Sequence, residues 1–176
     1  GGGTNLQAII DRSAAGELPH AELALVVSSR KNAGGLDRAE RAGIKHVYIG
    51  KENFEQDLIK LLDEHEIDII VLAGFLKILS SDFVSRYPDR IINVHPSLIP
   101  SFCGDGFYGL RVHEAVLSYG VKVTGATVHF VNEVTDGGKI IAQRAVDVKD
   151  GDTPEILQRR VMEEAEWKLL PAAVEK

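Results

Sequence analysis

Apolar runs alternate along the chain with segments that repeat apolar residues at helical spacing. The clearest strand covers residues 68–73, whose Ile, Val and Leu residues are apolar on both faces, as in a central parallel strand. Residues 54–65 repeat apolar side chains every three or four positions and predict an amphipathic helix. By the same criteria we expect further strands at residues 23–27, 46–49, 90–94, 125–131 and 139–146, and further helices after the N-terminal glycines and at residues 34–42, 81–86, 113–119 and 153–169.

Local signals mark where three of these helices begin or end. Thr4 or Asn5 is expected to cap the first helix, since a short polar side chain there accepts from the free N–H groups of the first turn. Gly43 suits the end of the second helix. Pro154 after Thr153 suits the start of the last, because proline has no N–H group to leave unpaired.

The alternation of strands and helices predicts a single α/β domain over residues 1–176. We expect a doubly wound, mostly parallel sheet with helices on both faces and right-handed crossovers. The strands at residues 125–131 and 139–146 are expected to form an antiparallel edge. A glycine-rich loop that opens a helix normally follows a strand, so we expect the chain to lack its first strand. In such sheets ligands bind beyond the carboxyl ends of the strands.

Composition narrows the class of partner. A formal charge of −6 and a pI near 5.5 argue against a nucleic-acid surface, which needs clustered Lys and Arg. No apolar run reaches the ~20 residues of a membrane span, and no secretory signal is evident, so we expect a cytoplasmic protein without membrane contact. The single cysteine, Cys103, excludes an internal disulfide. No cluster has metal-ligand spacing, so no metal is expected.

Asn93 and His95 stand two positions apart at the end of a predicted strand. Alternate strand residues face the same side, so both can project into one cleft. An amide beside an imidazole suits a reaction that develops an oxyanion, because Asn93 can donate to that oxygen and protonated His95 can donate a hydrogen bond or a proton. The alternative is a pair that only satisfies groups at a strand end.

Asp136 precedes Gly137 and Gly138, a sequence that most often marks only a turn. If that turn approaches His95, the carboxylate would favour the protonated imidazole. His129, on the strand predicted at residues 125–131, is a weaker candidate. A histidine that satisfies its neighbours in a sheet is the more common case.

Two loops have the composition of ligand sites. Residues 1–5 combine bare backbone N–H groups, a hydroxyl and a helix N-terminus, which suit a single phosphate, although a flexible terminus has the same composition. Residues 74–79 follow the central strand, where their apolar side chains could line a pocket for a flat heterocycle. The pattern Leu-x-Ile-Leu is otherwise typical of a core. Cys103, in a glycine-flanked loop, is expected to be a bystander.

Five motifs follow one another in a fixed order. They are residues 3–9 (GTNLQAI), 72–79 (LAGFLKIL), 93–100 (NVHPSLIP), 125–131 (GATVHFV) and 136–138 (DGG). In this order they resemble the successive motifs of the glycinamide ribonucleotide formyltransferases, a folate-dependent family, over essentially the whole chain. The third motif, Asn-x-His-Pro-Ser-Leu-x-Pro, is specific to folate formyltransferases.

The resemblance implies transfer of a formyl group from the co-substrate 10-formyltetrahydrofolate to the amine of a phosphoribosyl substrate in purine synthesis. It implies that Asn93, His95 and Asp136 are catalytic. By the same resemblance the ribonucleotide is bound by Gly3, Thr4, Asn5 and Glu166. The residues expected to contact the folate are Lys51, Leu76, Lys77, Ile78, Leu79, Asn93, Asn132, Glu133, Val134, Thr135 and Asp136.

The chain departs from the family pattern at several positions. The loop at residues 102–108 is longer than in many members, and Lys51 stands where the family usually has Arg. One extra residue precedes Glu166, and Trp167 stands where His is common.

Two other functions are weighed against this one. A formyltetrahydrofolate hydrolase usually has His in place of Pro96, so Pro96 and the Gly-Thr-Asn-Leu string favour the transferase. A non-catalytic folate- or nucleotide-binding module is the alternative from a different class. The joint presence of Asn93, His95 and Asp136 argues against it.

Overall fold

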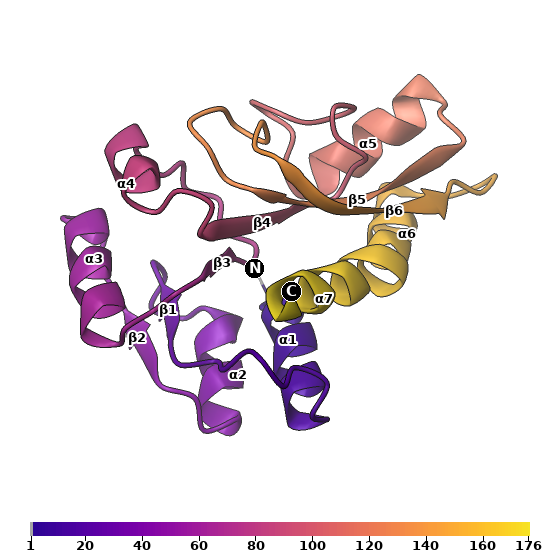
Figure 1. Ribbon diagram of the computed structural model, residues 1–176. Helices are drawn as coiled ribbons and strands as arrows, with labels where there is room; N and C mark the ends of the chain where they lie inside the picture. The colour runs from indigo at the N-terminus through magenta and orange to yellow at the C-terminus, as the bar shows by residue number, and fades with distance from the viewer. Residues whose placement is uncertain (1) are drawn as a thin grey trace.

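The computed structural model describes residues 2–176 and shows an α/β fold whose strands form two hydrogen-bonded blocks (Figure 1). The first block pairs β1 (Val26–Ser28) with β2 (His46–Tyr48) in parallel. The second block has the order β3-β4-β5-β6, with these bounds: β3 (Ile70–Leu72), β4 (Ile91–His95), β5 (Val123–Phe130) and β6 (Ile140–Asp147). Gly1, part of the expected phosphate loop, lies outside the described residues.

Helices fill the connections between these strands, as the apolar periodicity predicted. They are α1 (Thr4–Ala14), α2 (Gly34–Arg41), α3 (Phe54–Glu64), α4 (Ser81–Arg86), α5 (Leu110–Tyr119), α6 (Pro154–Val161), the π-helical turn η1 (Met162–Glu166) and α7 (Trp167–Glu175). The last helical run extends beyond residue 169, where we expected it to end. Pro171 lies inside α7 and is fully buried, so the packing of this face outweighs the hydrogen bond that proline cannot make.

The sheet is mixed to a greater extent than expected. β3 and β4 pair in parallel, whereas β4–β5 and β5–β6 are antiparallel. The antiparallel part is therefore more than an edge, because β5 and β6 span eight residues each. The strand expected at residues 23–27 is shorter, with β1 beginning at Val26. Among residues 2–176, β1 and β3 are not hydrogen-bonded to each other.

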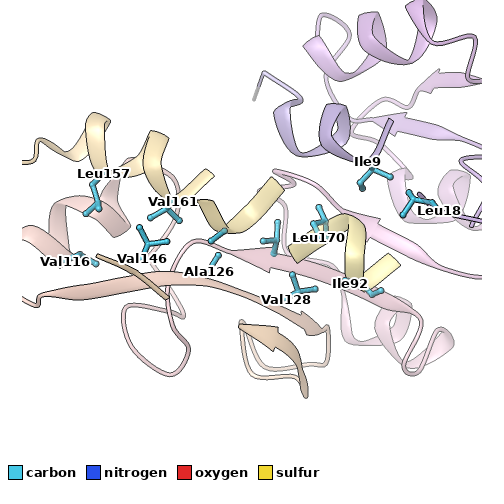
Figure 2. Packing of buried hydrophobic residues seen from close by; sticks show 13 residues of the cluster. Ile9, Leu18, Ile92, Val116, Ala126, Val128, Val146, Leu157, Val161 and Leu170 are labelled. Atoms are coloured by element: carbon cyan, nitrogen blue, oxygen red, sulfur yellow. The ribbon is translucent and has the colours of Figure 1, made fainter. Parts of the chain in front are cut away.

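The larger apolar core lies between the C-terminal helices and the antiparallel strands. Figure 2 shows Leu157, Val161 and Leu170 of these helices in one cluster with Ala126 and Val128 of β5, with Leu157 at the end beside Val116. All six side chains are fully buried. A second cluster joins α3 and α4 to Ile91 of β4, the strand that carries Asn93 and His95. β4 is thus packed from both sides, which fixes the direction of its carboxyl end.

An ion pair closes the loop between β6 and α6. Arg160 donates from both terminal nitrogens to Asp152, at 2.6 and 2.7 Å, and the two side chains are 13% and 4% exposed. Asp152 also accepts from the N–H of Lys149 at 2.8 Å. The hydrogen bonds from Arg160 lower the pKa of Asp152 to about 2. The pair ties α6, which carries Arg160, to the loop that precedes it.

We expect Asp152→Asn to lower the free energy of unfolding at pH 7 by about 1–3 kcal/mol, because the guanidinium loses a charged partner. Since the folded pKa lies below the unfolded value, this stabilisation is complete above pH ~4 and is lost as the pH falls toward 2. Urea unfolding between pH 7 and pH 3 measures the difference between the two proteins, which should shrink with acid. Asp150→Asn, a fully exposed neighbour, is the matched control.

Candidate active site

Asn93 and His95 lie at the carboxyl end of β4, as the alternation of strand residues predicted. In the antiparallel ladder Asn93 stands opposite His129 and His95 opposite Thr127. The side chains of opposite residues share a face of the sheet, so the imidazoles of His95 and His129 and the amide of Asn93 lie on one side. His95 and His129 are almost completely buried, at 4% and 2% exposed.

The turn that carries Asp136 approaches both histidines. One carboxylate oxygen, Oδ2, lies 3.5 Å from Nδ1 of His95, and the other, Oδ1, lies 3.7 Å from Nε2 of His129. The N–H of Gly104 donates to Oδ2 at 2.9 Å. The sequence left open whether Asp136 marks only a turn, and the structure brings it to His95. Gly104, from the long loop, is a contact that the sequence did not indicate.

Opposing effects act on the Asp136 carboxylate. Burial alone would raise its pKa, but the interaction with His129, the hydrogen bond from Gly104 and the charge of His95 together lower the pKa below its ordinary value. Asp136 is therefore an anion near neutral pH, although only 9% of its side chain is exposed.

Each histidine has one ring nitrogen at a backbone carbonyl. Nε2 of His95 lies 2.9 Å from the oxygen of Phe102, and Nδ1 of His129 lies 2.8 Å from the oxygen of Phe130. A carbonyl oxygen only accepts, so each of these nitrogens carries a hydrogen. The remaining nitrogen of each ring is the one that faces Asp136.

A third imidazole lies beneath this site on α5. His113 is fully buried, and neither of its ring nitrogens has a hydrogen-bond partner among residues 2–176. Burial, assisted by the charge of His95, lowers the pKa of His113 to about 4. His113 is therefore neutral near pH 7 and adds no charge beside His95. No sequence pattern indicated His113 beyond its place on a predicted helix.

The loop between β3 and α4 presents apolar side chains at the surface. Leu76 and Ile78 are 61% and 79% exposed, so the alternative that they belong to the core is wrong. Lys77 is also exposed, and Leu79 is half-buried against the second cluster. Exposed apolar side chains on an anchored loop are available for a flat apolar ligand.

The start of α3 anchors this loop through several contacts. The rings of Phe54 and Phe75 stack with centroids 5.8 Å apart, and Nζ of Lys77 lies 4.5 Å from the centroid of Phe54. Glu55 accepts from the N–H of Ser80 at 2.7 Å and also from its hydroxyl. Ser80 in turn caps α4 by accepting from the N–H of Phe83. Sequence reasoning did not single out Glu55.

Lys51 lies exposed, three residues before α3 begins. Across the site, the segment of residues 132–135 is exposed as well. Val134, the most apolar of these, is 64% exposed, and its N–H donates to the side chain of Asn132. Glu133 approaches Ser85 of α4 at 3.5 Å.

Two glycines determine the shape of the loops at the site. Gly3 has a positive φ of 72°, and a Cβ there would lie 2.9 Å from the backbone of Gly35. Gly3 is the N-cap of α1, and no side chain caps this helix. The prediction that Thr4 or Asn5 caps it is therefore wrong. Gly138 closes the turn of Asp136, where a Cβ would lie 1.6 Å from the oxygen of Phe130.

Asn5 instead reaches across to the C-terminal helix. Its Nδ2 donates to Oε2 of Glu166 at 2.9 Å, while its buried Oδ1 has no partner among residues 2–176. Glu166 is 6% exposed, and this burial raises the pKa of its carboxyl group, although the bond from Asn5 opposes the shift. Thr4, Asn5 and Glu166 thus lie in one region, beside Gly3.

The π-helical turn η1 ends at Glu166 and fits the extra residue that the family pattern led us to expect before it. A π-helical turn holds one more residue than an α-helical turn, so one extra residue can be absorbed in the winding of the helix. Glu166, at the end of this turn, faces Asn5.

A hollow of the described surface lies away from this site. It measures about 670 Å³ and is lined mainly by α1, α2 and the segment before β1, and none of Asn93, His95 and Asp136 lines it. In residues 2–176 we find no group of three His, Cys, Asp or Glu side chains that could hold a metal ion. Nor does any helix of this part combine the length and apolar character needed to cross a membrane.

Cys103 lies in the loop beside Asp136, half-buried, with its thiol 3.3 Å from the oxygen of Pro100. Burial and the nearby carboxylate raise the pKa of the thiol. A thiol with a raised pKa is a poor nucleophile near neutral pH, in accord with the expected bystander role.

The fold and the site define an α/β domain whose amide, imidazole and carboxylate meet at the carboxyl end of a central strand. The sequence pattern of the family described as "Formyl transferase" matches residues 1–174, and the chain belongs to this family.

Individual relatives agree with this assignment. A trifunctional purine biosynthetic protein adenosine-3 from Gallus gallus is 45% identical over 99% of this chain, which spans only 17% of that relative. A phosphoribosylglycinamide formyltransferase from Haemophilus influenzae is 37% identical over 99% of this chain and 82% of its own length. The structure of glycinamide ribonucleotide transformylase 1 from Symbiobacterium toebii has 40% identity and a TM-score of 0.90, covering 99% of this chain and 82% of that one.

The expected turn geometry can be tested at Gly138. Gly138→Ala should displace the loop of residues 132–138, because the new methyl group would overlap the oxygen of Phe130. We expect a loss of about 1–3 kcal/mol in the free energy of unfolding and shifted ring resonances of His95 and His129 in NMR spectra. Gly50→Ala, where the space around Cβ is open, is the control. Unchanged ring resonances in Gly138→Ala would contradict this account of the turn.

Proposed function

We propose that this chain forms a single domain that transfers a formyl group from 10-formyltetrahydrofolate to the amine of glycinamide ribonucleotide, a step of purine synthesis. The observation that carries the proposal is the meeting of Asn93, His95 and Asp136 at the end of β4. The family, and the relatives named for this reaction, support it. Cys103, a lone thiol, suits a reducing compartment and supports a cytoplasmic location.

In this reaction the neutral amine attacks the formyl carbon, a new C–N bond forms, and the bond from the carbon to N10 of the folate breaks. Negative charge develops on the formyl oxygen during the attack. Asn93 donates an amide N–H to that oxygen, which is the kind of preorganised donor that stabilises such charge. One proton leaves the amine, and one reaches N10.

His95 supplies the second donor through Nδ1. Its Nε2–H is already held by the oxygen of Phe102, so the proton available for the chemistry is on the side of Asp136. The Asp136 anion lies beside His95 and accepts a hydrogen bond from the water or amine that passes the proton.

The two substrates occupy separate sides of this centre in our proposal. The loop at Gly3, Thr4 and Asn5 binds the phosphate through backbone N–H groups at the start of α1, and Glu166 contacts the ribonucleotide. The folate ring lies against the 76–79 loop, with its polar edge on the segment of residues 132–136. Lys51 and Lys77 lie on the side of α3, where they can pair with the acidic tail of the folate.

Hydrolysis of the formyl folate is the rival reaction. A formyltetrahydrofolate deformylase from Pseudomonas syringae also has this fold, with a TM-score of 0.87, but at a lower identity of 28% and with 57% of its chain covered. Pro96 favours transfer. Formate release without the amine acceptor, at a rate comparable to transfer, would replace the proposed reaction with hydrolysis.

Asn93→Ala and His95→Ala are each expected to reduce kcat at least about 100-fold, because each removes a donor to the developing charge. Steady-state formyl transfer measures the effect, and circular dichroism checks that the variants are folded. His46→Ala, at an exposed histidine of β2, is the matched control. A folded His95→Ala protein with near-normal turnover would remove His95 from the mechanism.

Glu55 provides a test of the folate loop. Glu55→Ala should raise KM for the folate several-fold, up to about tenfold, because Ser80 loses the carboxylate that fixes the end of the loop. The KM for the ribonucleotide should stay unchanged, since its expected site lies at α1. Glu64→Ala, at the other end of α3, is the control. An equal rise in both KM values would indicate a general loss of structure.

A further inference from the structure

His129 is a buried polar group that the proposed reaction does not use. It stands directly opposite Asn93 in the β4–β5 ladder, and its Nε2 lies 3.2 Å from Nδ2 of Asn93. Because His129 is only 2% exposed, solvent does not compete for this contact.

The backbone determines which ring nitrogen of His129 carries the hydrogen. Nδ1 lies 2.8 Å from the oxygen of Phe130, which can only accept. In a neutral ring Nε2 then bears the lone pair and requires a donor. The amide nitrogen of Asn93 supplies that donor, so one N–H of Asn93 points to His129 and its carboxamide has a single preferred orientation.

The second histidine at Asp136 has the opposite arrangement. His95 donates from Nε2 to Phe102, and its Nδ1 faces the Asp136 oxygen at 3.5 Å. Among the described residues no N–H or O–H group donates to this Nδ1, whereas Nε2 of His129 already accepts from Asn93. Of the two rings, His95 is therefore the one whose nitrogen facing Asp136 has no other side-chain partner.

We propose that His129 is a positioning residue for Asn93: as the Nδ1–H tautomer it accepts one N–H of the Asn93 amide at Nε2 and so directs the second N–H to the reacting oxygen. The role in the reaction rests on the proposed formyl transfer. The tautomer itself does not, because it follows from the contacts of the free protein.

A charged His129 is the arrangement that competes with this one, and it is the form whose Nε2–H would lower the pKa of Asp136 by a hydrogen bond. It would direct Nε2–H toward Oδ1 of Asp136, 3.7 Å away, and so place two N–H groups against each other at Asn93. The amide of Asn93 would then turn its oxygen to His129. The 3.7 Å between Nε2 of His129 and Oδ1 of Asp136 is longer than a hydrogen bond. The 3.2 Å between Nε2 and Nδ2 of Asn93 is within hydrogen-bond range.

The first test reads the tautomer in the free protein. NMR spectra of protein labelled with ¹⁵N-histidine, recorded near pH 7, distinguish the Nδ1–H form, the Nε2–H form and the imidazolium, and the spectrum of His129→Gln assigns the resonance. We expect the neutral Nδ1–H form for His129. An Nε2–H form or an imidazolium at this residue would overturn the proposal, whatever the protein catalyses.

The second test separates the two ring nitrogens by substitution. His129→Gln can place a side-chain oxygen near the position of Nε2, whereas His129→Asn reaches only the position of Nδ1 and leaves Asn93 without an acceptor. We expect kcat to fall about tenfold in His129→Asn and less than threefold in His129→Gln, with both KM values within about twofold of wild type. Equal losses in the two variants would indicate packing alone and overturn the proposal.

A control variant addresses the bond to the backbone. His65 also places Nδ1 at a carbonyl, 2.8 Å from the oxygen of Leu61, but on α3, away from Asn93. His65→Asn should leave kcat unchanged. If the wild-type protein lacks formyl transfer, the proposed function fails while the NMR result still decides the tautomer.

Discussion

The candidate site depends on one buried anion, Asp136, which the N–H of Gly104 and the neighbouring His95 stabilise. Asp136 reaches His95 with one carboxylate oxygen and His129 with the other, and the N–H of Gly104 holds it in place. A buried carboxylate without such partners would take up a proton and lose its influence on the imidazoles. Three chain segments far apart in the sequence must therefore fold together before the site has its charge distribution.

The fold meets this requirement through packing rather than through the polar groups themselves. The C-terminal helices pack on β5 in the larger apolar core. In the second cluster, α3 and α4 pack on Ile91 of β4. The ladder between β4 and β5 then sets Asn93 against His129. Because register shifts in a sheet move every side chain to the other face, this pairing is strongly determined by the buried apolar residues.

Much of this arrangement could be predicted from the residues. Period-two alternation placed Asn93 and His95 on one face, and apolar periodicity located α3 and α4. The approach of Asp136 could not be derived from spacing, since it depends on how the 132–138 turn folds back over β4; the family resemblance supplied it. Glu55 and His113 were not predicted, because their roles come from contacts between distant segments. An acidic residue at a helix start and a histidine on a helix have no distinctive local pattern. The predicted cap of α1 was wrong because Gly3, with its positive φ, is the N-cap, one residue before Thr4.

The turn at Met162–Glu166 has a consequence for how such proteins diverge. A π-helical turn holds one residue more than an α-helical turn, and after this one the carboxyl group of Glu166 faces Asn5. Length variation within a helix can thus be confined locally, so that alignments with a one-residue gap in this segment need not imply a rotated face or a lost contact downstream. Homologous positions after such a gap are better matched by the direction of the side chain than by counting residues.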